Sequence, residues 1–156
     1  MVILDFFKNA LNLKNISRQG WIDKLSMEHP ESVADHSYSM AIMGMVISDL
    51  ENYDSEKMLK MILLHDLAES KIGDFTPDQI SKDKKEKIEN NAYDEIISTL
   101  PDTIKLQYGK IWEEYQKQES PESIIVHQID KLEMVLQAKM YQKGGAPTEA
   151  VESFFK

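Results

Sequence analysis

The spacing of apolar residues predicts a chain that is helical nearly throughout. Apolar positions recur every three to four residues, whereas alternating β-branched runs are few and no Asn-Gly hairpin dipeptide occurs in the 156 residues. We therefore expect an all-α fold, a compact bundle of several helices. The periodic stretches predict helices at residues 2–13, 31–50, 55–70, 80–99, 102–118, 121–143 and 147–155.

The prolines support these boundaries, because proline is tolerated in the first turn of a helix and disrupts its interior. All five fall at joints between predicted helices: Pro30, Pro77, Pro101, Pro121 and Pro147. No internal repeat or long linker divides the chain, so we expect residues 1–156 to form a single domain. The charged stretch Ser81–Asn91 mixes both signs at helical spacing, and we interpret it as a solvated helix face.

One apolar stretch contains a histidine and an aspartate side by side. In LLHDLAES, residues Leu63–Ser70, His65 and Asp66 are surrounded by apolar residues on all sides of the predicted helix. A buried, unpaired carboxylate is costly, and aspartate is rarely fully buried. Asp66 must therefore be paired, protonated or bound to a metal, and we expect other residues of the chain to share such a site.

Two further polar residues lie on apolar helix faces. His36 shares a face with Met40 and Met43, and Asp130 lies on the stripe that contains Val126. A divalent metal bound by two imidazoles and two carboxylates would account for all four unusual residues: His36, His65, Asp66 and Asp130. Such mixed nitrogen and oxygen sets suit several divalent ions. We expect one ion per subunit and leave open whether it is Co, Mn, Zn, Fe or Mg.

Composition and charge exclude several classes of protein. The net charge of −9 argues against binding to a nucleic-acid polymer, which needs a basic surface. The absence of cysteine removes thiol chemistry and fits a reducing compartment. There is no long uninterrupted apolar run, and the N-terminal MVILDFFKN carries an acid where a signal peptide has basic residues. We therefore expect a cytoplasmic protein that does not bind membranes.

The order H…HD…D and the blocks around it resemble the HD-domain metal-dependent phosphohydrolase superfamily, in particular its 5'-deoxynucleotidase branch. The blocks are RQGW (Arg18–Trp21), ESVADHS (Glu31–Ser37), HDLAES with KIGDFTP (His65–Pro77), and QIDKLEMVLQA (Gln128–Ala138). The resemblance implies a compact helical HD domain, usually a homodimer. It also implies that a divalent metal is used to remove phosphate from deoxynucleoside 5'-monophosphates.

Two acidic residues next to the His-Asp pair are candidates for catalysis. Glu69 follows Asp66 by three positions and His65 by four, which places it on the same face of a continuous helix. There it would act on a metal-bound water as an acid, a base or an orienting group. Asp74, after Gly73, resembles a second active-site acid, and the alternative is an ordinary turn aspartate.

Two residues upstream are candidates for binding substrate. Arg18 can grip two phosphate oxygens with its planar guanidinium. The resemblance places Trp21 in the nucleotide pocket, near the sugar or base, and the alternative is a tryptophan that only packs in the core. His127 lies three residues before Asp130 on the same face, and we interpret it as a packing residue rather than a ligand.

Other functions compete with a nucleotide monophosphatase. One is another HD-type enzyme that acts on cyclic nucleotides, nucleoside triphosphates or guanosine tetraphosphate. A second is a non-catalytic helical binding module in which the metal is only structural, although such a site would not need Glu69, Asp74 and Arg18 beside it. A di-iron bundle would require Glu-x-x-His pairs, and the sequence has none.

Overall fold

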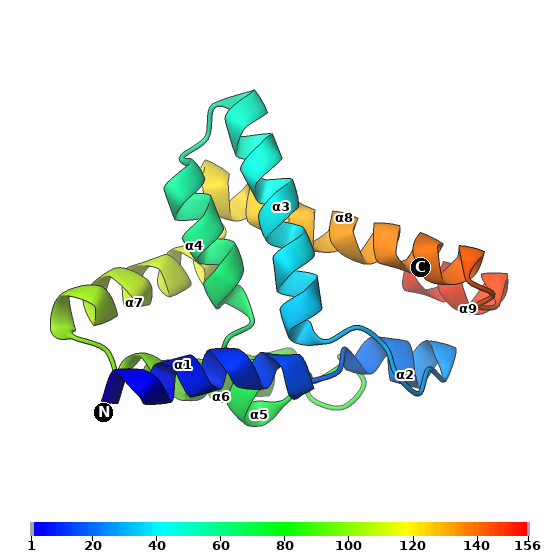
Figure 1. Ribbon diagram of the computed structural model, residues 1–156, viewed down its shortest axis with the longest axis horizontal. Coiled ribbons are helices and arrows are strands. Elements are labelled where there is room, and N and C mark those ends of the chain that lie inside the picture. The colour runs from blue at the N-terminus through cyan, green and yellow to red at the C-terminus, as the bar shows by residue number, and fades with distance from the viewer. Residues whose placement is uncertain (1, 156) are drawn as a thin grey trace.

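The computed structural model describes residues 2–155 and is built from helices, as the sequence predicts (Figure 1). The major helices are α1 (Val2–Asn12), α3 (Val33–Glu51), α4 (Ser55–His65), α6 (Lys82–Ile97), α7 (Asp102–Lys117) and α8 (Pro121–Lys143). The shorter ones are η1 (Leu13–Asn15), α2 (Gln19–Leu25), α5 (Glu69–Ile72), α9 (Thr148–Glu152) and η2 (Ser153–Phe155). None of the helices described has both the length and the apolar character needed to cross a membrane.

Local capping explains where the two longest helices begin. At α3, the Ser32 hydroxyl accepts a hydrogen bond from the Asp35 backbone N–H, and the Asp35 carboxylate accepts one from the Ser32 N–H. At α8, the Ser120 hydroxyl accepts from the Ser123 N–H, and Pro121 occupies the first turn. These signals lie in the sequence itself, and the predicted bounds of α8 are correct.

Two features of the predicted segmentation are wrong. Helix α2 was not predicted, because seven residues are too few to show a clear period. The predicted helix 55–70 is interrupted: α4 ends at His65, and the chain turns before α5 begins at Glu69. Through this turn the backbone bonds tighten to three-residue spacing, with the Glu69 N–H donating to the Asp66 carbonyl at 3.0 Å.

Helices α3 and α4 form an antiparallel hairpin that α8 crosses (Figure 1). α7 packs against both α4 and α8, while α1 lies beside α5 and α6 at the lower edge of this view. α2 and α9 pack together near one end of α8. The start of α3, the end of α4 and the middle of α8 thereby come together in the interior.

The core lies between the hairpin and α8 and consists mainly of large apolar side chains. Fully buried members include Met40, Met58, Met61, Ile62 and Ile129. Gly44 lets α3 and α4 approach closely, because a Cβ at this position would lie 2.3 Å from the Ile62 Cδ1. The close packing fixes the relative positions of the polar residues that these helices carry inward.

Candidate active site

The four predicted metal ligands converge where α3, α4 and α8 meet. His36 Nε2 lies 3.0 Å from Asp130 Oδ1 and 3.7 Å from Asp66 Oδ2. His65 Nε2 lies 3.0 Å from the same Asp66 oxygen. Ligand atoms of His36, His65 and Asp66 are all within 4.8 Å of one another, and Asp130 joins them through its contact with His36. We refer to these four residues as the metal group.

Hydrogen bonds on the far side of each imidazole fix its tautomer. His36 Nδ1 lies 2.5 Å from Glu133 Oε2, and His65 Nδ1 lies 2.5 Å from the Ile62 carbonyl oxygen. Both partners are acceptors, so each Nδ1 carries a proton and donates it. In the neutral ring, each Nε2 then has a lone pair that faces the carboxylates of the metal group.

The metal group fits a divalent cation. His36 Nε2, His65 Nε2 and Asp66 Oδ2 are buried and have no hydrogen-bond partner. Lone pairs on both sides of these short contacts repel each other unless a proton or a cation lies between them. Burial lowers the pKa of His36, but the carboxylates of Asp130 and Glu133 outweigh it and raise that pKa to about 9. A divalent metal satisfies the same set of atoms with imidazole and carboxylate ligands of the usual kind.

Arg18 brings a permanent positive charge to the edge of the metal group. Its Nη1 lies 3.8 Å from Asp66 Oδ2, and its Nε lies 3.8 Å from Glu31 Oε1. Burial disfavours the guanidinium charge, but the carboxylates of Asp66 and Asp74 outweigh that effect and raise the pKa of Arg18. Its side chain is only 15% exposed, so the charge is held in place rather than free in solvent.

Trp21 acts on Arg18 indirectly, through Glu31. The Trp21 Nε1–H donates to Glu31 Oε1 at 2.9 Å, the same oxygen that faces Arg18. The indole is only 1% exposed and packs against Tyr141 and Phe154. It therefore offers little free surface for stacking on a base, although it belongs to the wall of the cavity beside Arg18.

Glu69 and Asp74 lie beside the metal group in different environments. Glu69 is 3% exposed, and its Oε2 has no hydrogen-bond partner. Burial, followed by the charges of Asp66 and Asp74, raises the pKa of Glu69 well above its usual value. Asp74 follows Gly73, whose φ of 79° suits glycine, and its Oδ2 accepts a hydrogen bond from the Gln19 N–H at 2.9 Å. Asp74 thus connects the loop after α5 to the start of α2.

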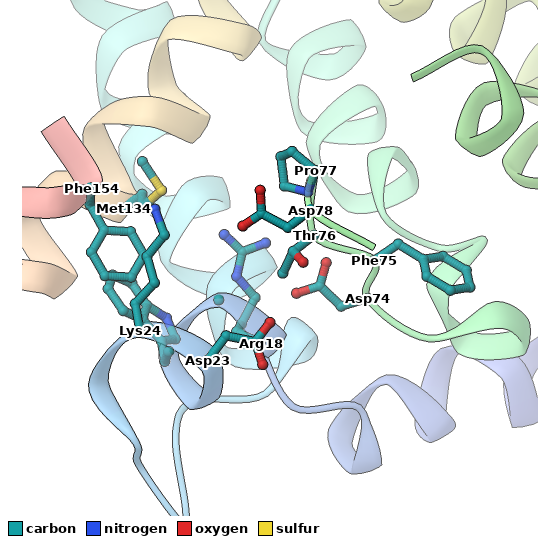
Figure 2. Close-up of a pocket in the computed structure, with 12 residues that line it drawn as sticks. Arg18, Asp23, Lys24, Asp74, Phe75, Thr76, Pro77, Asp78, Met134 and Phe154 are labelled. Atoms are coloured by element: carbon teal, nitrogen blue, oxygen red, sulfur yellow. The ribbon is translucent and has the colours of Figure 1, made fainter. Parts of the chain in front are cut away.

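Two adjoining cavities open onto these residues. One, of about 390 Å³, is lined by His65, Asp66 and Asp130 together with Glu69 and Lys85. The other, of about 340 Å³, shares Arg18, Asp74, Pro77 and Met134 with the first. Figure 2 shows Arg18 between the loop that carries Asp74 to Asp78 and a wall formed by Lys24, Met134 and Phe154. The guanidinium therefore lies where the charged cavity and the more apolar one meet.

The structure adds residues that the sequence interpretation did not single out. Glu133, 2% exposed, holds His36, and its position three residues after Asp130 was a usable signal because both lie on one face of α8. The side-chain ligand atoms of Glu31, His36 and Glu133 lie within 4.8 Å of one another, and no local sequence pattern predicts this contact. His127 stacks on Tyr115 at 4.1 Å and its Nε2 bonds the Tyr115 carbonyl, so it packs beside the metal group rather than within it.

Comparisons with known proteins show the family to which the chain belongs. The HD domain family model matches residues 10–156. The 5'-deoxynucleotidase HDDC2 of Dictyostelium discoideum is 41% identical over 97% of this chain and 85% of its own length. The human 5'-deoxynucleotidase HDDC2 is 38% identical over 90% of this chain and 68% of its own length. A solved structure, a conserved hypothetical protein from Pyrococcus furiosus, superposes with a TM-score of 0.82 at 32% identity, over 97% of this chain and 85% of that one. The chain therefore belongs to the HD-domain family, within the branch of metal-dependent phosphohydrolases that contains the 5'-deoxynucleotidases.

Proposed function

We propose that this protein is a metal-dependent phosphomonoesterase that hydrolyses deoxynucleoside 5'-monophosphates to nucleoside and phosphate. The observation that carries the proposal is a buried His-Asp group with unpartnered ligand atoms, next to Arg18 in an open cavity. The printed activity of the relatives, 5'-deoxynucleotidase, supplies the substrate class. A purely structural metal would have no use for an open cavity lined by Arg18 and Glu69.

In this proposal, His36, His65, Asp66 and Asp130 hold one divalent ion per subunit. When bound, such an ion lowers the pKa of a coordinated water and polarises a phosphoryl oxygen. Glu133 and the Ile62 carbonyl fix the two imidazoles so that each presents Nε2 to the site. The protein thereby prepares the ligand set before substrate arrives.

Arg18 binds the phosphate of the substrate. A guanidinium can donate two parallel hydrogen bonds to phosphate oxygens, and this one is already held against Asp66 at the edge of the metal group. Glu31, fixed by Trp21, keeps the guanidinium oriented from the opposite side. Trp21 contributes to substrate binding through this support rather than by direct stacking.

In this proposal Glu69 accepts the proton of the attacking water, and Asp74 is a second active-site acid beside it. The free Oε2 of Glu69 is buried next to the metal group, which suits a group that accepts or returns a proton without competition from solvent. The Asp74 carboxylate accepts a hydrogen bond from the Gln19 N–H. Because Asp74 lines both cavities, it lies where we expect the phosphate and the sugar of the substrate to meet. The second cavity, with Met134 and Phe154 on its wall, offers apolar surface to the nucleoside.

A substrate screen tests the proposal. The purified protein is loaded with Co, Mn, Zn, Fe or Mg in turn and incubated with all deoxy and ribo 5'-monophosphates, while phosphate release is measured. Cyclic nucleotides, triphosphates and guanosine tetraphosphate are included as the competing substrate classes. We expect release from deoxynucleoside monophosphates and its loss in Asp66→Ala. Turnover of only a competing class, or of no substrate with any metal, would contradict the proposal.

We further propose that the protein is a homodimer located in the cytoplasm. Leu132, Leu136 and Met140 form an exposed apolar stripe along α8, at 43%, 44% and 67% exposure. Such a stripe suits a self-complementary contact between two copies. Light scattering of wild type and Leu136→Lys, with the exposed Leu106→Lys as a control, tests the dimer. A wild-type monomer would refute it.

A further inference from the structure

Lys85 does not fit the interpretation of Ser81–Asn91 as a wholly solvated face. Its neighbours Lys82, Lys84 and Lys87 on α6 are exposed, as that interpretation expects. The Lys85 side chain is 31% exposed and lines the 390 Å³ cavity beside the metal group. One lysine of the charged run has therefore turned toward the active site.

The contacts of Lys85 hold its ammonium group at the cavity wall and leave donors unused. Nζ donates to the Phe75 carbonyl at 3.1 Å and lies 3.5 Å from Glu89 Oε1. An ammonium carries three N–H donors, and the Phe75 carbonyl takes one of them. Phe75 follows Asp74, so Lys85 also connects α6 to the loop that carries this acid.

A divalent ion on Asp66 and Asp130, together with Arg18, offsets only part of the negative charge of this cavity, which leaves room for a second cation. Five carboxylates line the cavity, against three cationic side chains: Arg18, Lys85 and Lys131. Lys131 is an exposed residue of α8, which leaves Arg18 and Lys85 as the cations held inside. Burial lowers the pKa of Lys85, but Glu89, Glu69 and Asp74 outweigh it and raise that pKa, so the ammonium stays charged.

We propose that Lys85 is a second phosphate-binding cation, which contacts a phosphate oxygen from the α6 wall while Arg18 contacts the phosphate from the start of α2. This inference rests on the proposed function, because it assumes that a phosphate monoester occupies the cavity. Even with the metal bound, a phosphate entering this cavity meets the carboxylates that do not hold the metal. A partly buried ammonium offsets their charge more effectively than one in solvent. Lys85 supplies this positive charge without displacing the carboxylates that serve the metal and the proton.

The experiment compares Lys85→Met, Lys85→Arg and the matched control Lys84→Met on the same helix. Two quantities are measured on metal-loaded protein: the KM and kcat for a deoxynucleoside monophosphate, and the dissociation constant of inorganic phosphate by calorimetry. A charge-assisted hydrogen bond typically contributes enough that its loss weakens binding about 10-fold or more. We expect Lys85→Met to raise both KM and the phosphate dissociation constant by that factor. Lys85→Arg should restore most of the affinity, and Lys84→Met should resemble wild type.

The calorimetry separates this proposal from the proposed function, since it needs no turnover. If no nucleotide is hydrolysed but phosphate binding still depends on Lys85, only the proposed function fails. If kcat falls in Lys85→Met while KM and phosphate affinity are unchanged, Lys85 only holds the Asp74 loop and the inference is overturned. Equal phosphate affinity in all variants, or no phosphate binding by the wild type, would overturn it as well.

Discussion

The buried contact between Glu133 and His36 should control how tightly the protein holds its metal. Glu133 is 2% exposed and its Oε2 lies 2.5 Å from His36 Nδ1. The carboxylate fixes the ring orientation and makes Nε2 a better electron donor. In Glu133→Gln the side chain keeps nearly the same size but loses its charge. We therefore expect the metal to bind more weakly while the fold is kept.

Loss of such an outer partner typically weakens metal affinity about 10- to 100-fold, or about 1.4 to 2.7 kcal/mol. At a fixed free metal concentration above both dissociation constants, the metal-dependent part of the stability falls by the same amount. One kcal/mol shifts the Tm of a domain of this size by about 2 to 4 °C. The rise in Tm on adding metal should thus be smaller by about 3 to 11 °C in Glu133→Gln.

The assay is competition for metal against a coloured chelator, together with melting curves with and without metal. Glu119→Gln is the matched control, because Glu119 is exposed between the end of α7 and the start of α8 and makes no contact with the metal group. Equal metal dissociation constants in wild type and Glu133→Gln would refute the reasoning, because the carboxylate would then not act through His36. A weaker affinity in Glu119→Gln as well would point to a general charge effect.

Three further predictions concern the metal, the acid and the arginine. Removing the metal with a chelator should lower the Tm by several degrees, because the metal binds only the folded state, and an unchanged curve in wild type would show that no buried metal is held. Glu69→Gln should lower kcat about 100-fold or more while metal content, measured by elemental analysis, stays at the wild-type level. Full activity of metal-loaded Glu69→Gln would shift the catalytic role to Asp74. Arg18→Ala should mainly raise KM, and Arg18→Lys should restore binding only in part, because an ammonium cannot reproduce the planar fork. Steady-state kinetics at matched metal occupancy measure both, and a KM that stays at the wild-type value in Arg18→Ala would exclude the phosphate contact.

The sequence was sufficient for those parts of the fold and site whose signals are local. The Ser120 cap and Pro121 define the start of α8 from adjacent residues. His36 and Asp130 could be selected as inward-facing residues because each interrupts an apolar face of its own helix. A buried polar residue is informative in this way because burial without a partner is so costly.

The parts that could not be predicted depend on how distant segments pack. Glu133 and His36 are 97 residues apart, and their contact exists only because α3 crosses α8. Lys85 looks like its neighbours in the charged run, and it is distinguished only in the folded chain, by its place on the cavity wall and its contact with the Phe75 carbonyl. Helical periodicity gives the face on which a residue lies, but it does not identify the segment that the face will meet.

The interruption after α4 explains how two consecutive residues can serve the same ion. In a regular helix, neighbouring side chains point about 100° apart and do not face each other. At the end of α4 the backbone of Asp66 leaves helical geometry, with φ −110° and ψ 11°. The Asp66 carboxylate then lies 3.0 Å from His65 Nε2, which a continuous helix over 55–70 would not favour. Leucine, alanine and glutamate around the pair all favour helix, so local propensity conceals this break. The His-Asp dipeptide therefore needs the end of a helix to act as a paired ligand, and the tight turn that follows places Glu69 beside the same site.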